Sequence, residues 1–341
     1  MIWLSWRQFR LQAVTAVAAV AAVVVVLAVT GPRLADLAAA GAAQVFDRLT
    51  PTDITLFWAG VIVVAGLPAL VGAFWGAPLV AHELERGTHR LAWAQSVTRT
   101  RWLTTKLVVT AVAAALAVGA VALAVSLWSA PLDGVVSRTR GSLPGHLTPV
   151  SFAMRGVVPV AYAVFAVVLG ATLGAVLRRP IPAMALTLAL YVVVQLVVPL
   201  WVRPHLVAPT TATVTISVDT LDGISADPSG RLDSLTVHTG DRDDWILSNE
   251  TLDRAGLVAT LPTWLADCAA PPTTTAVNGG VRARPIDPCL ARLNAEGYTQ
   301  RVVYQPADRF WPIQWAEAAL YLAASCLLAG FCVWWTRKRL S

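Results

Sequence analysis

The stretch that decides the fold is His82 to Lys106, HELERGTHRLAWAQSVTRTRWLTTK. It separates two long apolar segments, Trp58 to Ala81 before it and Leu107 to Trp128 after it. A helix needs about 20 apolar residues to cross the hydrocarbon core of a bilayer, and each segment is long enough. The stretch therefore predicts a polar elbow that joins two transmembrane helices on one membrane face and can dock a partner.

The order of residues within the elbow, residues 82–106, predicts a helix, a tight turn, a short transverse helix and a second rising helix. Gly87 is the residue type that most easily ends a helix in a left-handed conformation. Thr88 can cap a short helix over residues 89–94, and Thr98 can cap the helix that re-enters the membrane. This order is typical of a structured connection.

The residue order in the elbow also resembles that of a known family. An acid pair, Glu83 and Glu85, is followed by Arg-Gly-Thr, a short apolar stretch and a Ser-x-Thr-Arg-x-x-Trp run that ends in Lys106. This order resembles the coupling loop after the second transmembrane helix of ABC-2-type transporter permeases, of the kind found in actinobacteria. The likeness is strongest from Val80 to Leu107, and the span layout below extends it to the whole chain.

The resemblance implies that the elbow fits a cleft in an ATP-binding cassette subunit and passes its motion to the membrane helices. The residues expected to make that contact are Glu83, Glu85, Arg86, Gly87, Thr88, Leu91, Trp93 and Arg99. ATP and magnesium would be bound by the partner, no cofactor by this chain, and a second permease copy or a homologue would complete a dimer. The residues alone leave open a basic loop that only satisfies topology.

The composition indicates an integral membrane protein. Of 341 residues, 56% are hydrophobic and 13% charged, against about 25% charged in a soluble domain. We expect a mainly α polytopic fold with six transmembrane helices, the first ending at Gly31 and Pro32, and a small α+β extracytoplasmic domain between the fifth and sixth. The spans are residues 11–30, 58–81, 107–128, 157–177, 181–202 and 311–335. The parts are an interfacial helix (1–10), five helices with the elbow (11–202), the outer domain (203–310), and a sixth helix with a basic tail (311–341).

The distribution of charge orients these spans. With both termini inside, twelve basic residues lie on the inner side against two acids, Glu83 and Glu85, as the positive-inside bias requires. The basic residues are Arg7, Arg10, Arg86, Arg90, Arg99, Arg101, Lys106, Arg178, Arg179, Arg337, Lys338 and Arg339. Because they cluster at helix ends, topology and anionic lipid explain them, and no nucleic-acid partner is expected. The predicted location is the plasma membrane, with both termini cytoplasmic.

Two pairs of glycines recur at a spacing that permits close helix approach. They are Gly72 and Gly76 in the second span and Gly170 and Gly174 in the fourth. The first pair favours a packed, flexing helix near a dimer axis, but glycine is also simply common in membrane helices.

The outer segment is polar and carries two of the four cysteines. Residues 213–218 and 235–238 are predicted as strands, and residues 249–255 and 291–296 as short helices. Cys268 and Cys289 are an even pair in an oxidising compartment, which favours a disulfide worth about 3 kcal/mol over a metal site. No metal is expected.

Glu317 lies about one turn into the last span, with Gln314 and Tyr321 on the same helix face. An ionisable residue at membrane depth is costly and is by default a functional candidate. These three residues form a possible pathway or gate. Glu317 could line a substrate exit, pair with Arg309 or Arg203, or serve only structure.

Several motifs are absent from the sequence. There is no phosphate-binding Gly-x-x-x-x-Gly-Lys-Ser/Thr loop, no His-Glu-x-x-His and no Gly-x-Ser-x-Gly, so no catalytic residues are expected and ATP hydrolysis is assigned to another chain. The apolar spans favour export of a lipid, drug or peptide of hydrophobic or amphipathic character. The alternative is a membrane-anchored sensor or binding module that works through the outer domain.

Overall fold

The computed structural model describes residues 2–39, 49–87, 98–136, 144–145, 147–226, 232–241, 243–269 and 286–339. The chain forms two compact units, each described here by itself. The membrane unit combines Met1–Val207 with Phe310–Ser341, and the second unit is Ala208–Arg309.

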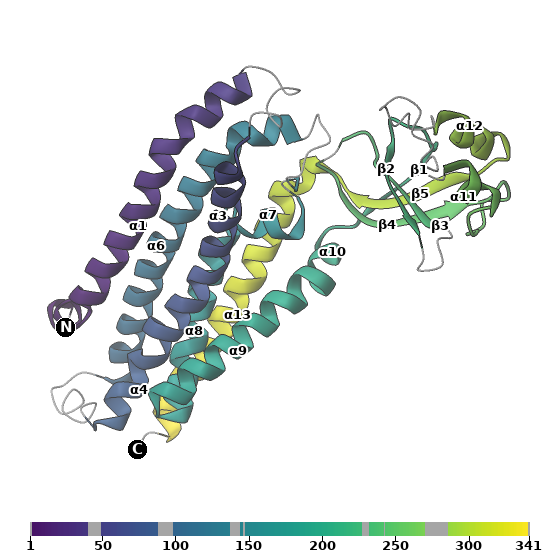
Figure 1. Cartoon of the computed structure of the whole chain (residues 1–341). Helices are drawn as coiled ribbons and strands as arrows, with labels where there is room; N and C mark the ends of the chain where they lie inside the picture. The colour runs from purple at the N-terminus through teal and green to yellow at the C-terminus, as the bar shows by residue number, and fades with distance from the viewer. Residues whose placement is uncertain are drawn as a thin grey trace. The chain divides into compact units, whose positions relative to one another are not determined.

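The membrane unit is a helical bundle (Figure 1). Among the described residues, six helices are long and apolar enough to cross a membrane, as predicted. Its elements are α1 (Ile2–Ala39), α3 (Pro51–Val71), the π-helical turn η1 (Gly72–Gly76), α4 (Ala77–Glu85), α6 (Arg99–Val136), α7 (Pro149–Ala153), α8 (Val158–Leu177), α9 (Pro180–Val197), the π-helical turn η2 (Val198–Val202), α10 (Arg203–Leu206) and α13 (Phe310–Arg339). The segments α3, η1 and α4 follow one another without a break and make up the second span.

Helix α8 is the centre of the bundle. In the most apolar part of α8, 72% of the residues are buried, against 11% for α1 and 22% for the span formed by α9, η2 and α10. Helices α3, α4, α6, α9 and α13 all pack against α8. A movement of α8 would therefore reach nearly every other helix.

The N-terminal helix differs from its prediction. Residues 2–10 are continuous with α1 and do not form a separate helix, and α1 continues through Gly31 and Pro32 to Ala39; an interfacial location of residues 2–10 stays a prediction. Leu27 and Leu34, on either side of the proline, are both buried in one apolar cluster with α3 and α6. The indole Nε1 of Trp128 also donates to Thr30 Oγ1 at 2.9 Å. Packing on both sides of Pro32 thus keeps the helix intact, as neighbouring helices do for membrane prolines.

The second unit contains two small antiparallel sheets (Figure 1). Strand β5 (Thr299–Gln305) lies between β1 (Thr210–Val214) and β4 (Trp245–Leu252), while β2 (Leu221–Ala226) pairs with β3 (Leu232–Val237). Helices α11 (Trp264–Ala269) and α12 (Asp287–Ala295) are joined by a disulfide between Cys268 and Cys289, and the 3₁₀ turn η3 (Ala307–Arg309) ends the unit. A buried apolar cluster that includes Ile216, Leu235 and Leu290 forms its core.

The local predictions for this unit were partly wrong. The strand expected at 213–218 begins and ends earlier, at Thr210–Val214, and the helix expected at 249–255 is largely part of strand β4. Strand β4 forms because β5 supplies its partner, with Glu250 opposite Arg301 in register. Cross-strand pairing of this kind outweighs local helix preference. The helix expected at 291–296 is confirmed by α12.

Candidate functional site

The two ends of the elbow have the cap geometry that the sequence predicts. Helix α4 ends at Glu85, Arg86 keeps near-helical angles, and Gly87 turns the chain with φ of 70°. At the other end, the Thr98 hydroxyl accepts from the Arg101 backbone N–H at 3.3 Å, and its carbonyl accepts from that of Trp102 at 3.0 Å. A left-handed glycine and a threonine cap therefore fix where the elbow leaves and re-enters the bundle.

An ion pair links these two ends. The Lys106 ammonium binds the Glu83 carboxylate across 23 positions of sequence and lies 4.8 Å from the centre of the Trp102 ring. The Lys106 and Glu83 side chains are 10% and 21% exposed, and Trp102 is buried. Because both side chains are largely shielded from water, removing one partner would leave the other charge without its counter-charge, and the pair thus ties α4 to α6.

The other expected contact residues divide by position. Glu85 and Arg86 are exposed at the end of α4, and Arg99 is half-buried at the start of α6. Thr88, Leu91 and Trp93, with the predicted short helix at 89–94, lie outside the described residues. Of the expected docking residues that are described, Glu85 and Arg86 are therefore the most accessible to a partner.

The helix that leads into the elbow rests on the backbone of α8. A Cβ added at Gly76 would lie 2.5 Å from the Val167 carbonyl oxygen, and one at Gly174 would lie 2.2 Å from that of Ala77. A Cβ added at Gly72 or at Gly170 would likewise lie 2.7 Å or less from backbone or Cβ atoms of the facing segment. The two glycine pairs thus pack on each other within one chain, so this face of η1 is occupied by α8; the position of a dimer axis stays a prediction.

A buried charged network lies at the opposite end of the bundle. Arg203 at the start of α10 donates from Nε to Glu317 Oε2 at 2.6 Å and from its Nη2 nitrogen to Glu317 Oε1 at 3.0 Å. The Tyr162 hydroxyl also donates to Glu317 Oε1, and the guanidinium lies 4.3 Å from the centre of the Phe152 ring. Arg203 is 1% exposed and Glu317 0%. The carboxylate is therefore fully paired, as a charge in an apolar bundle must be.

Gln314, one turn before Glu317, ties α13 to the start of α8. Its Oε1 accepts from the backbone N–H groups of Val157 and Val158 at 3.1 and 3.0 Å, and its Nε2 donates to the carbonyls of Phe152 and Arg155 at 3.2 and 3.1 Å. The first N–H groups of a helix have no hydrogen-bond partner within the helix. The Gln314 side chain supplies an acceptor for two of them. All four hydrogen-bonding positions of the amide are used.

Tyr321 completes the face of α13 that the sequence singled out. Its ring packs edge-on against Tyr162 at 4.6 Å between centroids, and its hydroxyl donates to Gln195 of α9 at 3.5 Å. Gln314, Glu317 and Tyr321 thus lie on one buried face, in contact with α8 and with the segment from α9 to α10.

Of the two partners left open for Glu317, the structure selects Arg203. The Arg309 guanidinium instead donates to the Ala208 carbonyl and to Gln305 within the second unit. Tyr162 and Phe152 were not predicted as part of the network. The single tyrosine of the fourth span, which otherwise has only Thr172 as a polar side chain, is a signal that could have found the first of them.

This network of Arg203, Glu317, Tyr162 and Gln314, called the latch below, holds helices together through its hydrogen bonds. Its carboxylate, guanidinium and amide are all engaged with one another or with the backbone. Among the described residues there is also no group of three or more His, Cys, Asp or Glu side chains placed to hold a metal ion. The network joins α13 and α10 to the start of α8. This is the end of the bundle away from the elbow.

The six apolar helices found among the described residues, with a polar elbow after the second and a neutralised charge pair inside the bundle, define a multi-pass membrane protein. Residues 14–203, more than half of the chain, match the family described as ABC-2 membrane transporter related, and the chain belongs to this family. No match was found among curated proteins or among solved structures. The matched region runs from α1 to Arg203 and contains the elbow.

Proposed function

We propose that this chain is the permease subunit of an ABC-2-type exporter and works with a separate ATP-binding cassette subunit. The family match across residues 14–203 carries this proposal, since it makes the chain a membrane subunit of a transporter. This sequence has no phosphate-binding loop, which supports assigning ATP hydrolysis to a separate subunit. ATP and magnesium would be bound there, and a second permease copy or a homologue would complete the assembly.

The elbow is the docking surface in this proposal, and it faces the cytoplasm of a cell whose plasma membrane holds the helices. The excess of Lys and Arg at this end of the bundle supports that orientation. Glu85 and Arg86 are exposed there and can meet charges of the ATPase, while the Glu83–Lys106 pair makes the two helix ends move together.

The contacts supply a route from the elbow to the far end of the bundle. Helix α4 continues into η1, whose glycines touch the backbone of α8 with no side chain between them. Helix α8 is then bound at its first turn by Gln314 and near it by the network of Tyr162 and Glu317. A push on the elbow therefore displaces α8, and α8 pulls on α13 and Arg203. We infer that this latch is the outer gate.

The test is association of the tagged full-length chain with the ATPase encoded beside it. Arg86→Glu reverses an exposed charge in the elbow, and we expect it to weaken the complex by about tenfold, equivalent to one charge contact of about 1.4 kcal/mol. Arg179→Glu is the matched control, because Arg179 is also exposed and lies just after α8, whose last residues pack on α4. Equal effects of the two variants, or no association in the wild type, would contradict the proposal.

A second candidate function is supported by the compactness of Ala208–Arg309. This unit has its own apolar core and a disulfide, so it can be a binding module in its own right. In that case the helices would anchor a sensor. Replacing residues 208–309 with a short flexible linker would abolish the response of a sensor, whereas an exporter would keep elbow-dependent ATPase activity.

A further inference from the structure

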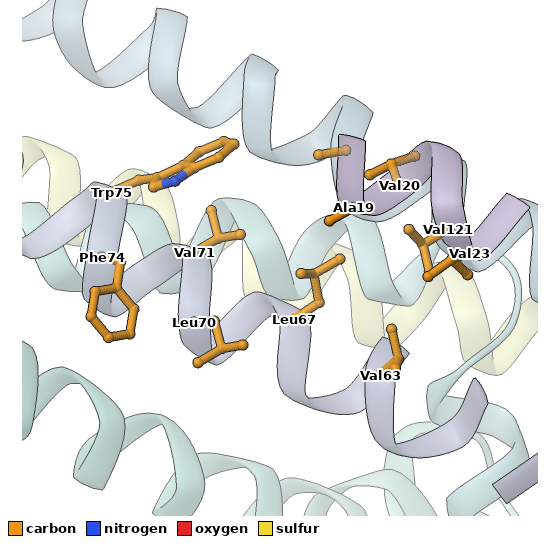
Figure 2. A pocket seen from close by; sticks show the side chains of 11 residues that line it. Ala19, Val20, Val23, Val63, Leu67, Leu70, Val71, Phe74, Trp75 and Val121 are labelled. Atoms are coloured by element: carbon orange, nitrogen blue, oxygen red, sulfur yellow. The ribbon is translucent and has the colours of Figure 1, made fainter. Parts of the chain in front are cut away.

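An apolar pocket of about 250 Å³ lies between α1, α3 with η1, and α6. Figure 2 shows Val20 of α1, Leu67 of α3 and Trp75 of η1 around this space. Every lining residue is Ala, Val, Leu, Phe or Trp. Toward the end of the bundle away from the elbow, Leu27 and Leu34 close the gap by packing in one cluster with Phe57 and Val61.

The size of the pocket restricts what can fill it. One turn of a helix 10 Å in diameter occupies about 400 Å³, so the pocket holds less than a single turn. A whole helix therefore does not fit inside the pocket, whereas part of a slender hydrocarbon chain does. The lining belongs to membrane-spanning segments, where the surrounding molecules with that shape are lipid acyl chains.

The charge at the elbow end indicates the headgroup that such a chain would carry. Lys106 precedes Ala117, a lining residue of α6, by 11 positions, or about 16 Å of helix, and half of a bilayer core is about 15 Å. A tail in the pocket would thus place its headgroup at the level of the basic residues of the inner helix ends. On α6 these are Arg99, Arg101 and Lys106. Glu83 neutralises Lys106, which leaves a surplus of positive charge that attracts an anionic headgroup.

We propose that this pocket is an entry site for an anionic amphiphile of the leaflet at the elbow end, with one acyl chain inserted between α1 and α3. The inference rests on the proposed function in taking that end as cytoplasmic and the amphiphile as cargo. It names a substrate class: acidic lipids or acylated acids rather than sugars or ions.

The same turn that lines the pocket also contacts α8. Phe74 and Trp75 of η1 line the space, while Gly72 and Gly76 of the same turn are pressed against the α8 backbone. The five residues of η1 thus lie between the pocket and α8 at the bundle centre. They continue directly into α4, which leads to the elbow. An inserted chain therefore bears on the segment that meets the ATPase.

The experiment is photolabelling of the full-length chain, reconstituted without ATPase, by phosphatidylglycerol with a diazirine in its acyl chain. We expect labelled peptides to cover residues 19–23 and 63–75, the pocket walls contributed by α1 and by α3 with η1. Ala117→Phe adds a ring to the wall contributed by α6 and should reduce this labelling about tenfold, equivalent to an overpacking cost of about 1.4 kcal/mol for the inserted chain. Leu116→Phe is the control, because Leu116 is 70% exposed and does not line the pocket.

Three outcomes would overturn the inference. Labelling spread evenly over the exposed helix faces would mean that the lipid is ordinary annular lipid. Equal labelling by phosphatidylcholine with the same tail would show that the pocket does not select an anionic headgroup. Crosslinks to a second copy in place of lipid would show that a partner side chain fills the space. Because this assay contains neither ATPase nor nucleotide, specific labelling can succeed while the co-purification test fails. Where the ATPase does associate, loss of lipid-stimulated ATPase activity in Ala117→Phe, but not in Leu116→Phe, supports the bound amphiphile as cargo, and equal stimulation in the two variants contradicts it.

Discussion

Removing the carboxylate of Glu317 should destabilise the membrane unit more than any exposed ion-pair change. Arg203 would lose hydrogen bonds of 2.6 and 3.0 Å, each worth about 1.5–3 kcal/mol because both partners are charged. It would keep Tyr162, the Pro149 carbonyl and the Phe152 ring, which return part of that loss. We expect Glu317→Ala to cost about 3–5 kcal/mol, the range for breaking a buried pair.

The assay is reversible unfolding of the purified chain in SDS, read as a double-mutant cycle. Arg203→Met combined with Glu317→Ala leaves no unpaired charge, so we expect the double variant to recover about 2 kcal/mol or more of the summed single losses. Arg33→Met is the control, since Arg33 is 53% exposed and lies 3.5 Å from Asp53, and it should cost under about 1 kcal/mol.

Two results would refute this reasoning. A coupling energy below about 0.5 kcal/mol would mean that Arg203 and Glu317 do not depend on one another in the folded bundle. A loss in Glu317→Ala no larger than that in Arg33→Met would mean that the carboxylate is hydrated, as a water-lined pathway requires and a closed latch does not.

Three further perturbations follow from the contacts. Gly174→Ala places a methyl group against a backbone oxygen of α4 and should cost about 1–3 kcal/mol and uncouple ATPase activity, whereas Gly66→Ala, with nothing within 4 Å, should be silent in both assays. Cys268→Ser opens the loop to Cys289 and should cost about 3 kcal/mol, seen as faster limited proteolysis within the second unit. Glu83→Gln breaks the pair with Lys106 and should lower stability by about 1 kcal/mol, while Glu85→Gln, exposed nearby, should leave the unfolding midpoint unchanged.

Each of these predictions has a clear contrary result. Wild-type coupling in Gly174→Ala would show that helix α4 does not drive α8 through the glycine contact. Unchanged proteolysis in Cys268→Ser would place the stability of the second unit in its core alone. A larger loss of stability in Glu85→Gln than in Glu83→Gln would mean that the exposed acid, and not the Glu83–Lys106 pair, stabilises the two ends of the elbow.

The sequence predicted what depends on composition and short-range order. Six spans follow from runs of apolar residues, and the turn at Gly87 and the cap at Thr98 follow from the conformations that glycine and threonine favour. These features need no distant partner. The elbow could therefore be located before any tertiary contact was known.

The features that were missed depend on partners far along the chain. Strand β4 was predicted in part as a helix because its register partner, β5, begins 47 residues after β4 ends, at Thr299 against Leu252. The choice between Arg203 and Arg309 for Glu317 could not be made from spacing, since Arg309 is nearer in sequence. Burial decides it, because only Arg203 enters the bundle.

The buried pair also sets an order for biogenesis. Arg203 leaves the ribosome 114 residues before Glu317, so for that interval a permanent cation has no carboxylate to neutralise it. A lone arginine within hydrocarbon is expensive, and it would wait among the lipid headgroups while the second unit is synthesised. Only when α13 inserts can Arg203 move inward beside Tyr162. The bundle therefore closes last around its final helix, and a nascent chain truncated before Glu317 would expose this arginine to membrane quality control.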